Sequence, residues 1–411
     1  MDKLIIFCEH AVETLTYFSR QLAQAFLEWG YEVFWLDFDM LALGAWKLKQ
    51  AVEEKEAVLI TFNFIGLSWE EELWEFDEEG QPSTCIWEQL GIHCINIMVD
   101  HPIYYYKALL KTVPDMQTFC IDRDHVAYMK RFYPQIPCEF LPLAGNLMER
   151  AVLTENQLTG TVMEPYSEWK KRPYPLVFTA NYIPLANIEN QLNQLEPEYR
   201  DFYYEIIDAF IRQPEKDLLS VIEPYMRREI PDITDQNLRD AMNTMQAVDL
   251  WIRTYFREKT VRILSESGLS VQIYGQDWDR VSWKHPGNLS VSGKAVHSID
   301  CVQAMAQSKI ALNTMPWFKD GAHDRVFTAM LQGTVALTDD SRYLRENFKD
   351  KETLVFYSLN ELDKLPGIVE GLMKEPERLY EVAGRAKDVA QRFHTWRQRA
   401  EILQIKIQAR S

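Results

Sequence analysis

Asp320, His323 and Arg325 bring a carboxylate, an imidazole and a guanidinium into one short stretch of the chain. A guanidinium carries a permanent charge in a fork that matches phosphate oxygens, so this combination suits the binding of an anion. Residues 310–312 are apolar and strand-like, and the apolar residues from Val326 onward recur at helical spacing. A helix that begins here adds free N–H groups and positive dipole charge at its amino terminus. The stretch therefore predicts an anion site at a strand-to-helix junction.

A second polar group follows the strongly apolar run 95–99. Asp100 and His101 place a carboxylate beside an imidazole, which suits proton transfer, and Tyr105 lies just beyond with a ring that can stack on a sugar or a base. His10 stands in a similar position after the first apolar run of the chain. Because ligands bind beyond the carboxyl ends of parallel strands, we expect these residues to line one wall of a cleft, with His101 facing His323.

Each of these groups also has a simpler interpretation. Asp320 has the side chain of a helix cap, and Arg325 can be a solvated surface charge. Asp100 can likewise cap a helix that starts at a proline. The residue types alone do not decide between a binding site and a set of caps.

Metal and dinucleotide sites have weak support. Two aspartate pairs, Asp37/Asp39 and Asp122/Asp124, follow strand-like runs and can hold Mg²⁺ on a diphosphate, but turn and cap roles fit them equally. No loop matches the dinucleotide pattern G-x-G-x-x-G or the phosphate-binding pattern G-x-x-x-x-G-K-[ST]. A hydride-transfer enzyme or an ATPase therefore has no direct support, and we expect no bound metal.

The elements that must position these residues alternate between short apolar strands and amphipathic helices. In residues 1–150 this alternation predicts an α/β domain with a parallel sheet. Its expected strands are 4–8, 31–36, 57–62, 94–99, 117–121 and 138–141. Residues 151–175 are polar and contain several prolines, which indicates a linker between domains.

A second β/α domain is expected over residues 176–392. It begins with the strand 176–180 and contains a charged, aromatic insertion over about 189–266 that should be helical. A further strand, 270–274, leads into Gly275. The carboxyl-terminal helix, 393–411, carries Phe393, Trp396 and Ile402, and we expect these apolar residues to pack back on the first domain. A cleft between two such domains is the default ligand site.

Composition narrows the class of protein. The net charge of −17 argues against a nucleic acid or an anionic membrane as the main partner. No apolar run is long enough for a membrane helix, and the chain begins with a charged residue and a strand, without a signal segment. The six cysteines show no C-x-x-C spacing and are expected to be buried thiols. These features predict a cytoplasmic protein.

Residues 320–327, together with 329–339, resemble the carboxyl-terminal domain of group 1 glycosyltransferases, especially the CgeB-like spore-maturation branch. Three other segments are similar to parts of that family. Residues 271–278 resemble the strand and loop before its nucleotide pocket, 100–105 its amino-terminal cleft motif, and 394–400 its closing helix. The resemblance covers the chain from about residue 95 to the end.

The resemblance implies a GT-B fold, in which two Rossmann-like α/β domains face each other across a cleft, and a metal-independent reaction with a nucleotide-diphosphate sugar. The wider group carries two glutamates that flank seven residues, and here Asp320 and Thr328 stand in those places. Its amino-terminal glycine-rich loop is absent, since residues 9–14 contain no glycine. The donor-binding residues implied are Asn181, Tyr274, Gly275, Asp320, Gly321, His323, Arg325 and Thr328.

The function that we predict is transfer of a hexosyl or N-acetylhexosaminyl group from a UDP-sugar to a protein or glycan acceptor. The wider group mostly retains anomeric configuration; an inverting enzyme would need a base, for which His101 or Asp100 is the candidate. Asp320 completes the predicted catalytic set, and His10 and Tyr105 lie on the acceptor side. No cofactor is expected besides the nucleotide-sugar co-substrate. The alternatives are a non-catalytic nucleotide-sugar or glycan-binding protein, and a spore or cell-surface assembly protein that uses the cleft for docking.

Overall fold

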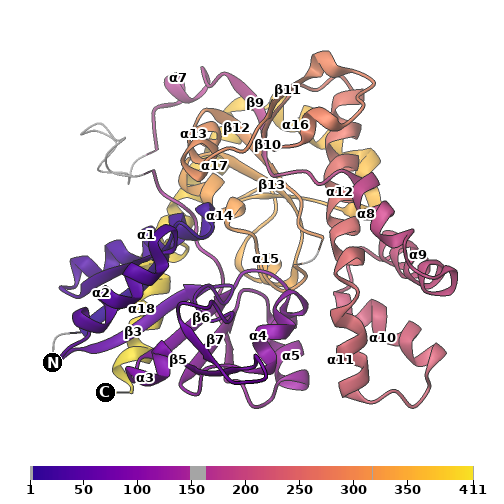
Figure 1. Ribbon diagram of the computed structural model, residues 1–411. Helices are drawn as coiled ribbons and strands as arrows, with labels where there is room; N and C mark the ends of the chain where they lie inside the picture. The colour runs from indigo at the N-terminus through magenta and orange to yellow at the C-terminus, as the bar shows by residue number, and fades with distance from the viewer. Residues whose placement is uncertain (1–2, 149–162, 317, 411) are drawn as a thin grey trace. The chain divides into compact units, whose positions relative to one another are not determined.

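The computed structural model describes residues 3–148, 163–316 and 318–410. The chain divides into two compact units (Figure 1). The amino-terminal unit is formed by Met1–Leu143 with Trp396–Ser411, and the carboxyl-terminal unit by Ala144–Thr395. Each unit is built on its own parallel sheet, as the alternation of strands and helices predicts.

The sheet of the amino-terminal unit has the order β2-β1-β3-β6-β7-β8, with every neighbouring pair parallel. Its central strands are buried along nearly their whole length, which explains why they read as continuous apolar runs. The strands are β1 (Lys3–Glu9), β2 (Glu32–Asp37), β3 (Glu56–Phe62), β6 (His93–Met98), β7 (Met116–Cys120) and β8 (Cys138–Phe140). The helices and the short hairpin around them are α1 (Glu13–Glu28), η1 (Phe38–Met40), α2 (Leu41–Ala51), β4 (Trp74–Phe76), β5 (Pro82–Cys85), α3 (Ile86–Gln89), η2 (Pro102–Tyr105), α4 (Tyr106–Leu110) and α5 (Arg123–Phe132).

The last helix, α18 (Trp396–Gln408), belongs to this same unit and packs on α1. The Trp396 indole is buried, with its ring centroid 4.9 Å from that of Phe18 and 5.8 Å from that of Phe62. Two of the apolar residues that were expected to pack there do not, since Phe393 is 60% exposed and Ile402 is 37% exposed. The buried stripe is instead formed by Trp396, Ala400, Leu403 and Ile407, which recur at helical spacing.

The carboxyl-terminal unit has a second all-parallel sheet, with the order β11-β10-β9-β12-β13-β14. Its strands are β9 (Tyr174–Thr179), β10 (Val271–Gln276), β11 (Leu289–Gly293), β12 (Ser308–Asn313), β13 (Val335–Asp339) and β14 (Val355–Tyr357). Its covering helices are α13 (Ser298–Ala306), α14 (Asp324–Leu331), α15 (Arg342–Asn347), η6 (Leu359–Lys364), α16 (Leu365–Lys374) and α17 (Pro376–Phe393), with the 3-10 turns η4 (Trp278–Arg280) and η5 (Pro286–Asn288) beside β10 and β11.

The expected helical insertion lies between β9 and β10 and consists of helices joined by short turns, so this prediction is confirmed. It consists of α8 (Leu185–Leu192), α9 (Pro197–Arg212), α10 (Leu218–Glu229), α11 (Asp235–Asn243) and the long α12 (Gln246–Glu266). In Figure 1, α9, α10 and α11 extend away from the sheet, whereas α12 runs back to it. The last helix of the insertion, α12, therefore lies against the sheet, and its residues can reach the strand ends.

Residues 163–175 were expected to continue the linker, but they belong to the carboxyl-terminal unit, and two of their side chains are anchored there. Trp169, in the short helix α7 (Tyr166–Trp169), is buried, and its indole N–H donates to the Gly333 carbonyl at 2.9 Å. Arg172 donates to the carbonyl of Ser308 at 2.7 Å and to that of Gln332 at 2.8 Å. The sequence around Arg172 does not show this role, because the carbonyl groups that it bonds lie far away in the chain. Residues 149–162 of the expected linker lie outside the described residues.

Strand order locates the place where each sheet can receive a ligand. Numbered by their order within the carboxyl-terminal unit, the strands lie as 3-2-1-4-5-6, so the order reverses between β9 and β12. In the amino-terminal unit they lie as 2-1-3-4-5-6, and the order reverses between β1 and β3. Ligands of open α/β sheets bind beyond the carboxyl ends of the strands at such reversals. The two places to search are therefore the ends of β9 and β12 and the ends of β1 and β3.

Candidate functional site

The amino terminus of α14 follows β12, at the reversal point of the carboxyl-terminal sheet. Its cap residue is His323, not Asp320, and the helix begins at Asp324. The His323 ring lies between two charged groups, with Nδ1 2.5 Å from Asp324 Oδ1 and Nε2 2.9 Å from Arg325 Nη1. An arginine can only donate, so Nε2 accepts and the ring proton sits on Nδ1, facing the carboxylate. His323 and Arg325 are thus brought together in one first helical turn, as their spacing predicts.

Burial and charge set the protonation of this turn. Burial, followed by the positive charge of Arg325, lowers the pKa of His323 to about 4, so the imidazole is neutral near pH 7. Burial alone would raise the pKa of Asp324, but His323, Arg325 and the Asn146 amide outweigh it and hold that pKa below its usual range. His323 keeps 17% of its side chain exposed. Both ring nitrogens are engaged, by Asp324 and by Arg325, so the positive charge for an anion must come from arginine.

A second arginine, which the sequence did not single out, lies at the same edge. Arg257 of α12 donates to the backbone carbonyl of Asn181 at 3.0 Å, just past the end of β9. Its charge also contributes to the lowered pKa of His323. No local pattern marks Arg257, because a charged residue on a long helix looks the same whether it faces solvent or a ligand site. Two guanidinium groups, on α12 and α14, therefore face the reversal point.

Thr328 is held by residues from the start of the carboxyl-terminal unit. Its hydroxyl oxygen accepts from the Asn146 backbone N–H at 3.0 Å and from the Asn146 side-chain amide at 3.2 Å. The same amide donates to Asp324 at 3.0 Å, and Gln332 donates back to the Asn146 carbonyl at 3.1 Å. Gly145 lies so close that an added Cβ would stand 2.6 Å from the backbone of Phe327. The threonine thus anchors segment 144–146 on α14, a role that sequence reasoning missed.

Asp320 and Gly321 belong to the loop that leads into α14. Asp320 is 9% exposed, and its Oδ2 lies 3.3 Å from the Arg342 side chain. The Ser341 hydroxyl donates to the Gly321 carbonyl at 2.6 Å. The loop is therefore fastened to the start of α15, and its carboxylate is paired rather than used as a helix cap.

The ends of β9 and β10 bring together the other residues of the expected donor site. Gly275 is required as glycine, since an added Cβ would lie 1.9 Å from the Ala180 carbonyl oxygen. Asn181 accepts from the Gln276 N–H at 3.0 Å. Burial, followed by its bond with Tyr174, raises the pKa of Tyr274 to about 12, so its hydroxyl remains protonated.

In the amino-terminal unit the best-supported polar residue at the sheet edge is Asp100. Its Oδ2 accepts from the Tyr105 hydroxyl at 3.2 Å and from the Asn63 side-chain amide at 3.3 Å. Asn63 also accepts from the Val99 N–H at 2.8 Å, so it bridges the ends of β3 and β6. Asn63 and Phe64 both have left-handed backbones, with φ of 52° and 60°. Two such residues in a row are strained, and strain of this kind gathers at functional sites.

His101 faces inward. It is 5% exposed, caps η2 by accepting from the Ile103 N–H at 3.2 Å, and lies with its ring centroid 4.6 Å from that of His125 and 4.8 Å from that of Tyr128. The cap of this turn is thus His101 rather than Asp100. Of the adjacent pair, Asp100 is the one that is only half buried, which favours it over His101 as the group that meets a ligand.

His10 lies past the end of β1 with a left-handed φ of 65°. Its Nδ1 is 2.8 Å from Asp37 and 3.7 Å from Asp39, and these three are the metal-ligand cluster found within the described part of the chain. The hydrogen bond to Asp37 raises the pKa of His10. Asp37 also caps η1 and Asp122 caps α5, so the turn and cap alternative describes both aspartate pairs.

The two Rossmann-like units, the second with its helical insertion, have the GT-B fold of glycosyltransferases. Residues 253–404 match a family described as glycosyl transferase-like, and this segment includes Arg257 and the whole of α14. Among curated proteins, no sequence matches the chain. In the described residues, no helix combines the length and the apolar character needed to cross a membrane.

Solved structures of glycosyltransferases are similar to the chain over nearly its full length. An alpha-glucosyltransferase in complex with UDP has a TM-score of 0.52 at 10% identity, covering 98% of this chain and 99% of that one. An alpha-glucosyltransferase with UDP and a 13-mer DNA has a TM-score of 0.50 at 11% identity, covering 98% of both chains. Sucrose-phosphate synthase from Thermosynechococcus elongatus has a TM-score of 0.48 at 11% identity, covering 100% of both chains. At such low identity the likeness shows the fold alone.

Proposed function

We propose that this protein is a glycosyltransferase that moves a sugar from a nucleoside-diphosphate sugar, with UDP as the nucleotide, to a protein or glycan acceptor. The observation that carries the proposal is the pair Arg257 and Arg325, which lies at the amino terminus of α14 where the strand order reverses. The family match over residues 253–404 includes both arginines, and the UDP in the similar alpha-glucosyltransferase structures supports the choice of nucleotide. The motif over 320–339 supports the CgeB-like branch.

The diphosphate leaving group gains negative charge as the glycosidic bond breaks, so fixed donors aimed at it lower the barrier. Arg325 would exchange its bond with His323 Nε2 for bonds to phosphate oxygens, and Arg257 and the first N–H groups of α14 would complete the donor set. Each charge-assisted bond contributes about 1.5–3 kcal/mol. Because two guanidinium groups supply the countercharge, we propose that the reaction needs neither a metal nor a cofactor.

The sugar would be held by the loop before α14. Asp320 can accept from sugar hydroxyl groups in place of its contact with Arg342, and Gly275 and Asn181 form the opposite wall at the ends of β10 and β9. We propose transfer of a hexosyl or N-acetylhexosaminyl group with retention. On the amino-terminal unit, Asp100 with Tyr105 and His10 forms the acceptor side.

Five of the six free cysteines are buried, which fits a cytoplasmic, reducing setting.

The test is a panel of UDP-sugars with EDTA present, read out both by thermal shift and by release of UDP. A donor at a hundred times its dissociation constant adds about 2.7 kcal/mol of stability, which a melting curve detects. We expect one UDP-sugar to stabilise the protein and to be hydrolysed slowly without acceptor. If no nucleotide sugar stabilises the protein, or if turnover requires an added divalent metal, the proposal is wrong in its donor or in its chemistry.

A non-catalytic nucleotide-sugar binder is the second candidate, and the bonding of Thr328 favours it. Where the wider group carries its second glutamate this chain has the neutral Thr328, whose hydroxyl oxygen accepts two bonds from Asn146. Tight UDP binding with no hydrolysis and no transfer to any glycan or protein would select this function.

A further inference from the structure

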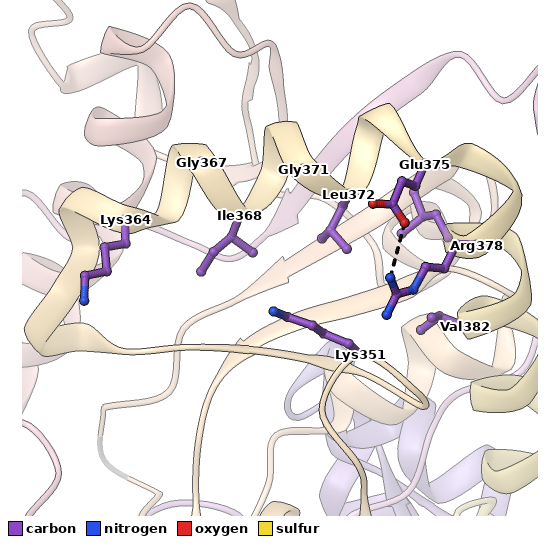
Figure 2. A pocket seen from close by; sticks show the side chains of 10 residues that line it. Lys351, Lys364, Gly367, Ile368, Gly371, Leu372, Glu375, Arg378 and Val382 are labelled. Carbon is purple, nitrogen blue, oxygen red and sulfur yellow. Dashed lines mark hydrogen bonds and ion pairs between the residues drawn. The ribbon is translucent and has the colours of Figure 1, made fainter.

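A groove on the carboxyl-terminal unit lies apart from all the residues of the candidate site. It has a volume of about 380 Å³ and runs along α16, facing the start of α17 and the loop at Lys351 (Figure 2). Ile368 and Leu372, one turn apart on α16, form a half-buried aliphatic floor, and Leu379 and Val382 of α17 are buried beneath it. The floor is therefore apolar.

The rim of the groove is positively charged, although the whole chain carries a net charge of −17. Lys351, Lys364 and Arg378 line it, against Glu375 as its one lining carboxylate among the described residues. Arg378 lies 3.3 Å from Glu375, and Lys364 pairs with Glu361 outside the groove. Lys351 makes no ion pair within the described ranges, and Figure 2 shows its ammonium group extending below Ile368 and Leu372. An anionic group would therefore be drawn to the part of the rim that Lys351 and Arg378 line.

Two glycines on the same face of α16 keep the groove open. Gly367 and Gly371 stand inside the helix, where glycine is less favourable than alanine. Neither has a left-handed backbone, and a Cβ added to either would meet nothing within 4 Å. The fold alone thus explains neither glycine, whereas a ligand that lies along the helix does.

We propose that this groove binds an amphipathic anion, with an alkyl chain along Ile368 and Leu372 and a carboxylate or phosphate head between Lys351 and Arg378. The apolar floor selects the chain, and the cationic rim selects the head. A neutral molecule with the same tail would lose the contacts at the rim, and a free phosphate would lose those at the floor.

The experiment measures binding of dodecanoate and dodecyl phosphate to the full chain by titration calorimetry, below their micelle concentrations. Dodecyl maltoside serves as the neutral probe with the same tail, and inorganic phosphate as the head without a tail. We expect both anionic probes to bind at least tenfold more tightly than either comparison molecule. Equal binding of the neutral probe, equal binding of inorganic phosphate, or no binding of the anionic probes would overturn the proposal. In the last case an acidic partner helix would be the next occupant to test.

The variants separate binding from folding. Lys351→Ala with Arg378→Ala should weaken the anionic probes at least tenfold, and Arg392→Ala on the exposed part of α17 is the charge control. Gly367→Ala and Gly371→Ala should each raise the melting temperature by roughly 2 °C and yet weaken binding severalfold. Gly384→Ala, in α17, should raise it similarly without changing binding, since a Cβ there also meets nothing within 4 Å. If the alanine variants of Gly367 and Gly371 bind the anionic probes as tightly as the parent, the ligand does not lie along α16 and the proposal is wrong.

Discussion

The two sheets differ in the charged groups that lie beside the points where their strand order reverses. In the amino-terminal unit the residues beyond the strands are mainly acidic, including Asp37, Asp39, Asp100 and Asp122. In the carboxyl-terminal unit, Arg257 and Arg325 lie beside the α14 amino terminus at the corresponding edge. The carboxyl-terminal unit is therefore suited to bind an anion, whereas the amino-terminal unit is suited to bind neutral or hydroxyl-bearing groups. This difference is why we assign the donor to the carboxyl-terminal unit.

The helix caps sharpen this contrast. Helix α5 is capped by the Asp122 carboxylate, which accepts from the Asp124 N–H at 2.7 Å and adds negative charge. Helix α14 has the neutral imidazole of His323 at its cap position, and because Nδ1 carries the ring proton it does not accept from the Arg325 N–H, whose nitrogen lies 3.5 Å away. At the first helix an anion would meet the Asp122 cap, whereas at the second no cap side chain accepts from the Arg325 N–H and the Arg325 guanidinium offsets the charge of Asp324. The choice of cap thus decides which edge can take a diphosphate.

Replacement of Arg325 by alanine should have the largest effect. The loss of a charge-assisted bond of about 1.5–3 kcal/mol lowers UDP affinity by roughly tenfold to more than a hundredfold, and turnover with it. Titration calorimetry with UDP measures the affinity, and Arg385→Ala is the surface control. A variant that melts much earlier yet binds UDP normally when folded would mean that Arg325 is structural and that the donor site lies elsewhere.

The free energy of unfolding should depend on pH through His323, at the amino terminus of α14. The His323 pKa of about 4 lies below its unfolded value, so its contribution is lost as the pH falls from 6.5 toward 4. Burial raises the pKa of Asp339 to about 6, so its contribution is lost as the pH rises from 3.8 through 6, the opposite slope.

His323→Gln should therefore reduce the loss of stability between pH 7.5 and pH 5 by on the order of 2 kcal/mol, since each pKa unit corresponds to about 1.4 kcal/mol. Denaturant unfolding at a series of pH values measures this difference. Asp339→Asn is the paired variant and should change the slope in the other direction. Identical pH profiles for His323→Gln and the parent would show that the imidazole is not held neutral in the folded protein.

Asp100→Asn tests the role of the amino-terminal unit in acceptor binding and should have the smallest effect of the three substitutions. The substitution keeps the shape and the contacts with Asn63 and Tyr105 but removes the charge, so transfer to the acceptor should fall by about tenfold while UDP affinity stays unchanged. Steady-state kinetics with varied donor and varied acceptor separate the two. A fall in UDP affinity would contradict the assignment of separate roles to the two edges.

Local sequence patterns determined much of the fold and part of the site. The alternation of buried apolar strands with amphipathic helices is a short-range property, so both parallel sheets and the helical insertion follow from it. The start of α14 is equally local, because cap, first turn and apolar face lie within a few residues of His323. For the same reason the sequence by itself brought His323 and Arg325 into one helical turn.

Only the tertiary structure decided the contacts between residues far apart in the chain. Asn146 bonds Thr328 across 182 positions, and Arg257 reaches Asn181 across 76. The orientation of His101, which packs on His125 and Tyr128, also depends on how α5 lies against the turn after β6. A residue's type and its immediate neighbours are the same whether its side chain turns inward or outward. The packing of distant elements settles that direction, and with it the distinction between a buried cap and a group that can meet a ligand.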